Sequence, residues 1–462
     1  MTKVLELLRK MAFWTVDTLK GGGIRKHYSQ IKLVMAKPDS KKAKDIRNLN
    51  LAKILEHTAT TVPFYSNIKI SADGLCLQDF PIIDKQLIRE NFEDFRSLGY
   101  RDKHNHAVLT SGSTGKPFKI LHDRNKRDRN TADTLFFAKR AGFELGSKLY
   151  YLRLWDKQYQ KNRLLSFVQN IATYSVDDLN EQTVGELVKA LDSDRGSINI
   201  LAYSSALDTI CKHLDKHYSG KPLHCKMKSV IAMAEALKPD TRDKIQTYFS
   251  TRVVSRYSNS ENGIFAQQKV DGSGDDFEIN WASYHIEILD LNEDKAVAMG
   301  ELGRLVVTDY FNFAMPMVRY DTGDVGIMDI DPKTGELVLS KIDGRKMDMF
   351  TNTKGEYISS HIIHHILQFN GIDQFQFVEE ENNEYIIKLK VSQNLDERDE
   401  NELRNLYRDY FGEDAIITIQ YVEDIPLLPS GKRKLVINKA IEKFGKPQKK
   451  IPVTSDKIGY TP

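Results

Sequence analysis

The feature that most constrains the fold is an alternation of short apolar runs with helical patterns in the middle of the chain. Leu149–Leu154, Ile198–Tyr203 and Ser229–Met233 have the length and apolar character of buried strands. Helical spacing follows at Asp208–His217 and at Pro239–Phe249, which opens with proline in its first turn. Because strands that alternate with helices tend to lie parallel, this region predicts a largely parallel sheet covered by helices.

The remainder of the chain has a different texture. Shorter strands are expected at His285–Leu289, Arg304–Thr308 and Glu336–Ile342. Towards the C-terminus we expect a helix at Ser360–Phe369, a strand at Glu384–Val391, a charged helix at Asp396–Phe411 and a strand at Ala415–Val422. The prediction is therefore an α/β protein with a large N-terminal domain, residues 1–343, and a smaller α+β C-terminal domain, residues 344–462.

Composition bounds the class of protein. A chain of 462 residues is long enough for two or three packed units. Its 67 Lys and Arg residues against 64 Asp and Glu give a net charge of +3, so we expect no nucleic-acid partner. Three scattered cysteines, Cys76, Cys211 and Cys225, argue against a disulfide scaffold and suit a reducing cytosol. With no apolar run of transmembrane length, a cytoplasmic location is expected.

The N-terminus has the pattern of an amphipathic helix that ends at a run of three glycines. Its apolar stripe consists of Val4, Leu7, Leu8, Met11 and Trp14, and Arg25, Lys26 and Lys32 follow it. We expect this stripe to pack on the body of the protein, which is the commonest origin of such patterns. Weak association with a membrane surface is the alternative, because a Trp-bearing stripe beside cationic residues also suits an interface.

The sharpest local signal is the stretch Leu109–Ile120, LTSGSTGKPFKI. Small hydroxyl residues and glycines before a lysine suit a loop whose backbone N–H groups surround phosphate oxygens. The stretch is not a Walker A loop, since only Ser113 and Thr114 separate its glycines and Pro117 follows the lysine. An ordinary surface turn is the alternative interpretation, because short glycine motifs often match by chance.

Further segments place this loop in a wider pattern. In chain order they are Ala232–Leu237 (AMAEAL), Tyr257–Gly263 (YSNSENG), Arg319–Gly326 (RYDTGDVG), Gly344–Asp348 (GRKMD) and Pro429–Lys434 (PSGKRK). Together with the loop they resemble, in order and spacing, the motifs of the adenylate-forming superfamily of acyl-CoA synthetases, luciferases and peptide-synthetase adenylation domains. Leu51–Tyr65 and Glu301–Tyr320 are similar to the phenylacetate–CoA ligase group, and more narrowly to ligase-like proteins of capsule and surface-polysaccharide biosynthesis.

The resemblance implies a reaction and a set of residues. ATP would activate a small carboxylic acid as its acyl-AMP, with Mg²⁺ present and CoA as the acyl acceptor, and the small domain would act as a mobile lid. The residues that would surround the nucleotide are Ser111, Gly112, Ser113, Thr114, Gly115, Lys116, Glu235, Ala236, Tyr257, Ser258, Asn259, Ser260 and Asp324. Among them, Asp324 would accept hydrogen bonds from both ribose hydroxyls, a task for which its two oxygens are suited.

Three residues would carry the chemistry according to the same resemblance. Glu261 would ligate Mg²⁺, a hard cation that prefers carboxylate oxygen and water. Arg345 would reach the ribose or phosphate at the domain junction. Lys432 would place a compact positive charge against oxygens shared by the carboxylate and the α-phosphate.

Two departures from the family pattern bear on the acceptor and on the pocket. Ser258 stands where relatives carry glycine, and Met347 stands where many carry a polar hinge residue. Because the hinge serves the thioester-forming step, Met347 leaves a sugar, an amine or a carrier protein open as alternative acceptors. A nucleotide-binding protein without turnover is a further alternative. The acid itself is not identified by the sequence.

Overall fold

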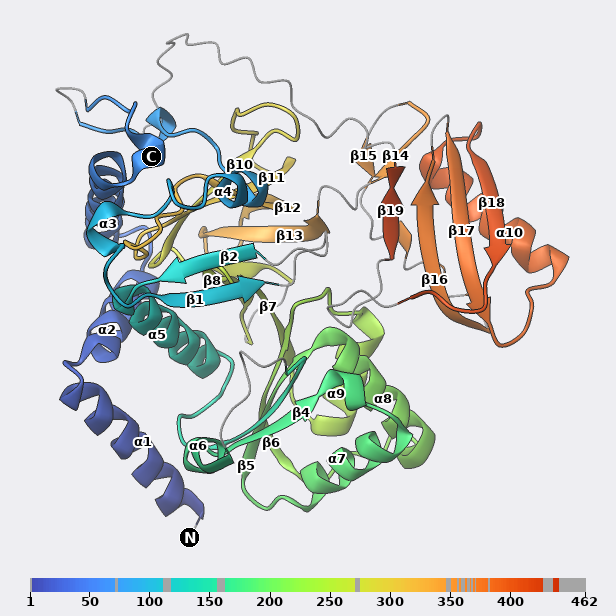
Figure 1. Cartoon of the computed structure of the whole chain (residues 1–462). Coiled ribbons are helices and arrows are strands. Elements are labelled where there is room, and N and C mark those ends of the chain that lie inside the picture. Colours follow the sequence, from blue (N-terminus) through green and yellow to red (C-terminus); the bar gives the residue numbers. More distant parts are fainter. Residues whose placement is uncertain are drawn as a thin grey trace. The chain divides into compact units, whose positions relative to one another are not determined.

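The computed structural model describes residues 2–70, 74–110, 118–155, 163–270, 275–345, 350–354, 357–358, 362–363, 366, 369, 371–380, 383–426 and 435–439. These residues form two compact units, one running through Gly344 and the other beginning at Arg345 (Figure 1). The predicted fold class is confirmed, since a large mixed α/β sheet occupies the first unit and a smaller sheet the second.

The first unit contains most of the secondary structure. Its helices are α1 (Thr2–Leu19), α2 (Gly23–Ala36), α3 (Lys41–Thr61), η1 (Pro63–Tyr65), η2 (Leu77–Asp79), α4 (Lys85–Glu90), η3 (Leu98–Tyr100), α5 (Arg124–Arg140), α6 (Arg163–Gln169), η4 (Val176–Asp178), α7 (Glu181–Ser193), α8 (Ser204–Tyr218) and α9 (Pro239–Phe249). Its strands are β1 (His106–Thr110), β2 (Phe118–His122), β3 (Lys148–Arg153), β4 (Ile171–Ser175), β5 (Ser197–Tyr203), β6 (Lys226–Met233), β7 (Val253–Asn259), β8 (Gly263–Gln268), β9 (Phe277–Ile279), β10 (Tyr284–Leu289), β11 (Leu302–Asp309), β12 (Tyr320–Ile330) and β13 (Leu337–Arg345).

One large sheet organises this unit. Within the described residues its strand order is β10-β11-β12-β13-β9-β8-β7-β6-β5-β3-β4. The strands from β4 to β7 pair in parallel, whereas β8 pairs antiparallel with β7. The expected parallel sheet is therefore confirmed for that half, and the shorter strands after Tyr284 form the antiparallel half. The change of direction falls between β7 and β8, and the turn that joins them contains Glu261.

Each half of the sheet has its own core. Helices α7, α8 and α9 cover the parallel strands, with α8 contacting β5 and β6 and α9 contacting β7 (Figure 1). The cluster beneath them is apolar and contains Leu187, Ile200, Ile210 and Val230, all at most 1% exposed. A separate cluster joins α2, α3 and α5 to the antiparallel strands. Burial of these apolar stripes explains why the sequence shows helical spacing between the strands.

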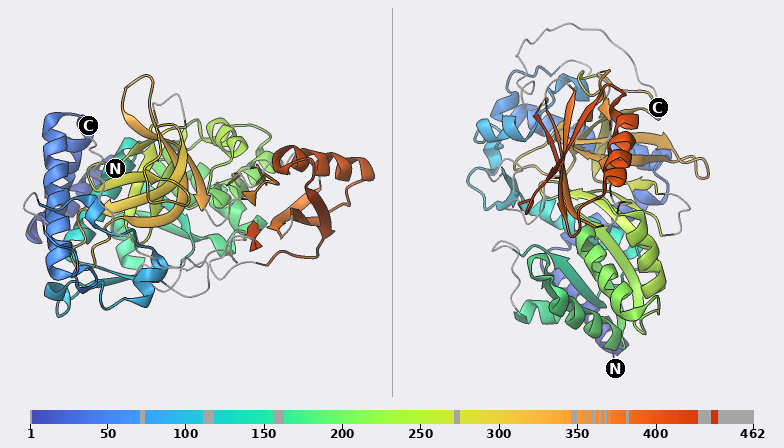
Figure 2. Two further views of the ribbon diagram at one scale, coloured as in Figure 1. Left: turned by 90° about the horizontal axis from the view of Figure 1, so that it is seen from above. Right: turned by 90° about the vertical axis from the view of Figure 1, so that its right-hand side faces the viewer.

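The second unit contains β14 (Phe350–Thr351), β15 (Tyr357–Ile358), β16 (Ile372–Glu379), β17 (Glu384–Val391), α10 (Glu397–Phe411), β18 (Ile416–Tyr421) and β19 (Val436–Asn438). Its main sheet has the order β18-β17-β16-β19, and α10 packs on it through Leu403, Tyr407 and Phe411 (Figures 1 and 2). The predicted elements at Glu384–Val391, Asp396–Phe411 and Ala415–Val422 are confirmed within a residue at each end. Most of the helix expected at Ser360–Phe369 lies outside the described residues.

One prediction about the N-terminal helix is wrong. The stripe that we expected to pack on the body is largely exposed, with Val4 at 61%, Leu7 at 57%, Leu8 at 54% and Met11 at 58% exposure. The expectation fails because α1 touches the body along another side, where the Glu6 carbonyl meets Gly146 and Lys10 pairs with Glu144. Contact of this stripe with a membrane surface stays a prediction. Within the described part of the chain, no helix has the length and apolar character needed to cross a bilayer.

Helix α5 is held in the first unit by buried charges. Lys126 Nζ lies 2.6 Å from Asp309 Oδ2, and both side chains are fully buried. One turn further along α5, Arg129 donates to Ser283 Oγ at 2.8 Å. Because an unpaired buried charge is far costlier than a paired one, removing either partner of such a pair is strongly destabilising. The pair thus fixes α5 against the end of β11.

We expect Lys126→Met to lower the free energy of unfolding by about 3–5 kcal/mol, because it leaves Asp309 buried without a counter-charge. Urea denaturation of the full chain measures the change. Lys10→Met, which removes the exposed pair with Glu144, is the matched control and should cost less than about 1 kcal/mol. Adding Asp309→Asn to Lys126→Met should recover part of the loss, and equal losses in the two single lysine variants would contradict the assignment.

Candidate active site

The described site residues gather at one edge of the large sheet. Strands β6 and β7 are parallel neighbours, and their register pairs Met233 with Arg256. Glu235 and Ala236 follow the end of β6, while Ser258, Asn259 and Ser260 lie at and after the end of β7. Ligands of α/β sheets bind outside the carboxyl ends of parallel strands. The structure therefore brings the two predicted nucleotide segments together at an edge where ligands bind in such folds.

A tyrosine–carboxylate pair joins β7 to β12. The Tyr257 hydroxyl donates to Asp324 Oδ2 at 2.8 Å and lies 3.3 Å from Thr322 Oγ1. Thr322 Oγ1 in turn accepts from the Asp324 backbone N–H at 3.1 Å and donates to the Leu305 carbonyl at 2.9 Å. Burial raises the pKa of Tyr257 well above its ordinary value, and the charge of Asp324 raises it further. Tyr257 therefore stays protonated and orients the carboxylate.

Glu261 is the buried carboxylate of the site. It is 1% exposed, and its Oε1 accepts a hydrogen bond from the Tyr320 hydroxyl at 2.9 Å. Lys85 Nζ lies 2.8 Å from the same oxygen. Burial raises the pKa of Tyr320 well above its usual value, and the Glu261 charge adds to this, so Tyr320 remains a donor. Hydrogen bonds of this kind, made by an ionised acceptor, are stronger than neutral ones.

Lys85 was missed by the sequence analysis. It is the first residue of α4, directly after the N-cap Asp84, and its Nζ lies 5.9 Å from the centroid of the Phe118 ring. The pairing with Glu261 joins residues 176 positions apart (261 minus 85). No motif marks Lys85 in the sequence, because the contact arises only when α4 packs beside β2.

Hydrogen bonds from neighbouring strands and within the turn hold the turn that carries Glu261 in place. His122 Nε2, at the end of β2, donates to the Glu261 carbonyl oxygen at 2.7 Å. The Tyr284 hydroxyl donates to the Asn262 carbonyl at 2.7 Å and accepts from Lys126 Nζ at 3.1 Å. Asn259 Oδ1 accepts from the Asn262 N–H at 2.8 Å. The buried charges of α5 thus support the turn on which the candidate metal ligand sits.

Glu235 has a local structural role as well. Its Oε2 accepts from the Ser205 N–H at 2.9 Å, and its carbonyl accepts from Ser204 Oγ at 2.9 Å. A carboxylate at this position satisfies an orphan N–H at the start of α8 and complements the helix dipole. Ala236 beside it is exposed. The Glu235 side chain thus points to the start of α8.

Several predicted site residues fall on parts of the chain that the structure does not describe. They are Ser111, Gly112, Ser113, Thr114, Gly115, Lys116 and Lys432, together with the side chain of Arg345 and the hinge residue Met347. The strands that flank the predicted phosphate loop are described. β1 and β2 pair antiparallel with Thr110 opposite Phe118, so the loop connects the two strands of a hairpin.

The donor set around Glu261 is compatible with Mg²⁺. Mg²⁺ in proteins usually binds one or two carboxylates and completes its shell with water and substrate phosphates. Glu261 supplies one buried carboxylate, and its backbone carbonyl accepts from His122 at the end of the strand that follows the predicted phosphate loop. The Lys85 ammonium and the Tyr320 hydroxyl pair with Oε1 of this carboxylate, so Mg²⁺ would bind through the other oxygen, Oε2.

The chain is similar in sequence or in fold to several known proteins. Residues 349–439 match the CapK C-terminal domain family. Protein CapK of Staphylococcus aureus is 22% identical over 427 residues, covering 85% of this chain and 89% of that protein. 2-Hydroxyisobutyryl-CoA ligase in the postadenylation state, in complex with R3-HIB-AMP, has a TM-score of 0.66 at 15% identity and covers 88% of this chain and 91% of its own. ATP-bound MatB from Rhodopseudomonas palustris has a TM-score of 0.51 at 15% identity, and the match covers 71% of this chain and 66% of MatB.

The fold is accordingly that of the adenylate-forming ligases. In sequence the chain is similar to CapK along most of both proteins, and its residues 349–439 match the CapK C-terminal domain family. The resemblance to adenylate-forming ligases is thereby confirmed at the level of the fold. The phenylacetate–CoA ligase-like branch and the roles of individual residues stay predictions.

Lowering the pH should destabilise the protein through His122. Burial, followed by the charge of Lys126, lowers the pKa of His122 from 6.5 to about 4. The folded protein keeps this ring neutral while the unfolded chain protonates it. Its contribution to stability is therefore present above about pH 6.5 and is lost as the pH falls towards 4. Between pH 7 and pH 5 this group should lower the free energy of unfolding by about 2 kcal/mol, measured by urea denaturation.

His122→Gln keeps an amide N–H for the Glu261 carbonyl and should flatten the pH dependence by about that amount. Burial also lowers the pKa of His27 and of His285 to about 4, so part of the slope remains in both proteins. His224→Gln, at an exposed histidine beside Asp192, is the control and should keep the wild-type slope. Identical slopes in His122→Gln and the wild type would contradict a buried neutral ring.

Proposed function

We propose that this protein uses ATP to activate a small carboxylic acid as its acyl-AMP and then transfers the acyl group, with CoA as the leading acceptor. The observation that carries the proposal is the Tyr257–Asp324 pair, held at 2.8 Å beside the carboxyl ends of parallel strands in a chain with the ligase fold. A carboxylate held in one orientation at such an edge suits two adjacent ribose hydroxyls.

The described residues support distinct tasks. Asp324 would bind the ribose, and Tyr257 would hold one of its oxygens in place by a hydrogen bond. Glu235 and Ala236 after β6, with Ser258, Asn259 and Ser260 at the end of β7, would form the adenine side of the pocket. Ser111, Ser113, Thr114 and Lys116, on the loop that also contains Gly112 and Gly115, would hold the β- and γ-phosphates. Arg345 and Lys432 would act from the smaller domain.

Glu261 would hold Mg²⁺, which neutralises phosphate charge when pyrophosphate leaves. Lys85 is proposed as a positioning residue for this carboxylate. Its Nζ, 2.8 Å from Glu261 Oε1, balances the buried negative charge and holds the side chain beside β2. Because both reactants of acyl adenylation are anions, charge neutralisation and orientation supply most of the catalysis.

The acceptor distinguishes two versions of the proposal. 2-Hydroxyisobutyryl-CoA ligase has been captured with 2-HIB-AMP and CoA in its thioesterification state, and its fold matches this chain with a TM-score of 0.55. This likeness favours CoA. The apolar Met347 in the predicted hinge favours the alternative, transfer to a sugar, an amine or a carrier protein. A nucleotide-binding protein without turnover is less favoured, since binding alone would not need a buried Glu261 or Lys432.

Asp324→Ala should weaken ATP binding about tenfold to a hundredfold, since a hydrogen bond to a charged group contributes roughly 1.5–3 kcal/mol. Tyr257→Phe removes the hydroxyl that contacts Asp324 and Thr322 but keeps the carboxylate, so it should cause a smaller loss of affinity, about tenfold or less. Isothermal titration calorimetry measures both. Asp329→Ala, an exposed aspartate on the same strand, is the control and should bind ATP like the wild type. Unchanged affinity in Asp324→Ala would place the nucleotide elsewhere.

ATP–pyrophosphate exchange with a library of carboxylic acids tests the reaction itself. At least one acid should support exchange, and Lys432→Ala should reduce it on the order of 10²–10³-fold with little change in ATP affinity, because the lysine acts on charge that develops in the transition state. Lys439→Ala, which removes a lysine paired with Glu380, is the control. Nucleotide binding without exchange for any acid would favour the non-catalytic alternative. Addition of CoA, sugar or amine acceptors to the active acid then identifies the second half-reaction.

A further inference from the structure

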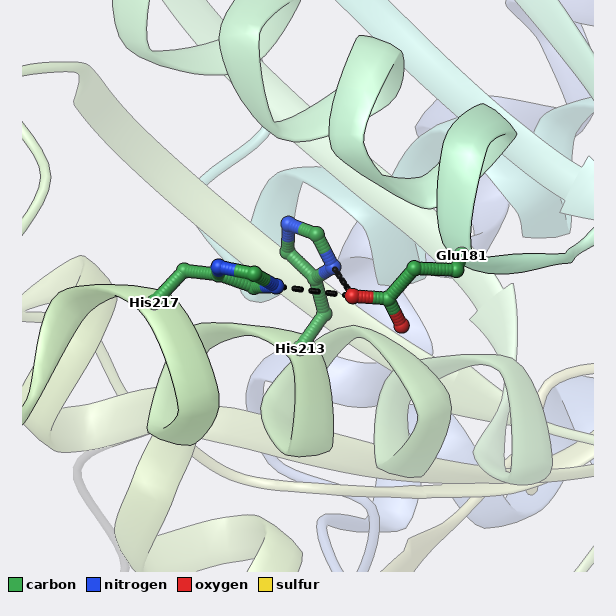
Figure 3. A group of neighbouring side chains, drawn as sticks. All are labelled: Glu181, His213 and His217. Atoms are coloured by element: carbon green, nitrogen blue, oxygen red, sulfur yellow. Dashed lines mark hydrogen bonds and ion pairs between the residues drawn. The ribbon is translucent and has the colours of Figure 1, made fainter.

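Two histidines and a glutamate meet where α7 begins and α8 approaches its end. His213 and His217 lie one turn apart on α8, and Glu181 is the first residue of α7. Figure 3 shows both imidazoles directed at the same carboxylate oxygen. Glu181 Oε1 lies 2.7 Å from His217 Nε2 and 3.5 Å from His213 Nδ1. Within the described residues this is the one group of three or more such side chains whose ligand atoms all lie within 4.8 Å of one another.

The cluster has the chemistry of a metal site. Two imidazole nitrogens and one carboxylate form a ligand set that Zn²⁺ uses repeatedly, often with two histidines one helical turn apart. His213 is the informative member. Its side chain is only 11% exposed, and its Nδ1 is buried and makes no hydrogen bond among the described residues. Buried polar atoms in proteins almost always have a partner. Here its nearest partner is the Glu181 oxygen, 3.5 Å away, which is long for a hydrogen bond.

We propose that Glu181, His213 and His217 bind a divalent transition-metal ion of the Zn²⁺ class, which clamps the start of α7 to the end of α8. Each imidazole would supply the lone pair of the nitrogen that faces Glu181, and water would complete a tetrahedral shell. This site lies on the helical layer over the parallel strands and is independent of the proposed adenylation. It goes beyond that function, because the metal would stabilise the layer whose other end, at Ser204 and Ser205, bonds to Glu235.

The competing explanation is a surface ion-pair cluster. Lys216 Nζ lies 3.2 Å from the same Glu181 oxygen, and the Glu181 side chain is 60% exposed. Exposed pairs of this kind contribute little to stability. In such a cluster each imidazole would donate a proton to Glu181, yet His213 Nδ1 lies 3.5 Å from the Glu181 oxygen, longer than an ordinary hydrogen bond. The two explanations give opposite expectations for Lys216. If the cluster is an ion pair, Lys216 strengthens it. If the cluster binds a metal ion, the positive charge of Lys216 repels that ion.

The test uses the full chain purified without a polyhistidine tag and freed of metal by a chelator. Zn²⁺ is titrated by calorimetry, and Co²⁺ binding is followed by its visible absorption. The wild type should bind one ion per chain, with the intense bands of tetrahedral Co²⁺, and should melt at a higher temperature with Zn²⁺ than without. His217→Ala and Glu181→Gln should each lower the affinity at least about tenfold.

Two controls make the result specific. Lys216→Ala removes the competing charge and should bind Zn²⁺ as tightly as the wild type or more tightly. His224→Gln, at an exposed histidine on the same unit, should bind like the wild type. His217→Ala and Glu181→Gln change exposed side chains, and circular dichroism checks that they fold. Absence of wild-type binding, unchanged affinity in His217→Ala, or lost affinity in Lys216→Ala would each overturn the proposal. ATP–pyrophosphate exchange, measured in parallel, fails or succeeds independently of these outcomes.

Discussion

The buried ion pair between Lys126 and Asp309 is the interaction on which the described site depends. Its 2.6 Å contact lies in a fully buried environment, so the geometry of both partners is strongly enforced. Lys126 Nζ also donates to Tyr284, whose hydroxyl donates to the carbonyl of Asn262. Asn262 immediately follows Glu261, and the carbonyl of Glu261 accepts from His122. A helix, three strands and a turn are thus linked by buried polar contacts.

This support explains how a single buried carboxylate is held in position. Glu261 lies on the turn where the large sheet changes from parallel to antiparallel pairing, and two donors meet its Oε1. At the same edge, Tyr257 holds Asp324 across the sheet. Sites built from residues at the ends of several strands are accurate because hydrogen-bonded strands are rigid. The Glu181–His213–His217 cluster lies instead on the outer helical layer, where it bears on the stability of that layer.

The sequence predicted the elements far better than it predicted the contacts. Strands such as Ile198–Tyr203 and the helix Pro239–Phe249 are found where their local patterns place them, because burial of an apolar face leaves a periodic signal. The exposed stripe of α1 has the same signal, and the pattern alone could not tell burial from exposure. Glu235 was predicted from a motif to surround the nucleotide, and the bond of its side chain to the start of α8 was not predicted. Lys85 carried no signal at all.

The sequence by itself determined the fold class, because strand and helix periodicity is a property of neighbouring residues. Through the resemblance of its motifs to those of adenylate-forming ligases, it also predicted Tyr257, Glu261 and Asp324 as site residues. Only the tertiary structure decided that Tyr257 bonds to Asp324, that Lys85 pairs with Glu261, and that His213 and His217 face Glu181. Each of these contacts joins residues far apart in the chain. Their distance and their burial depend on how helices pack on the sheet, and no local pattern records that packing.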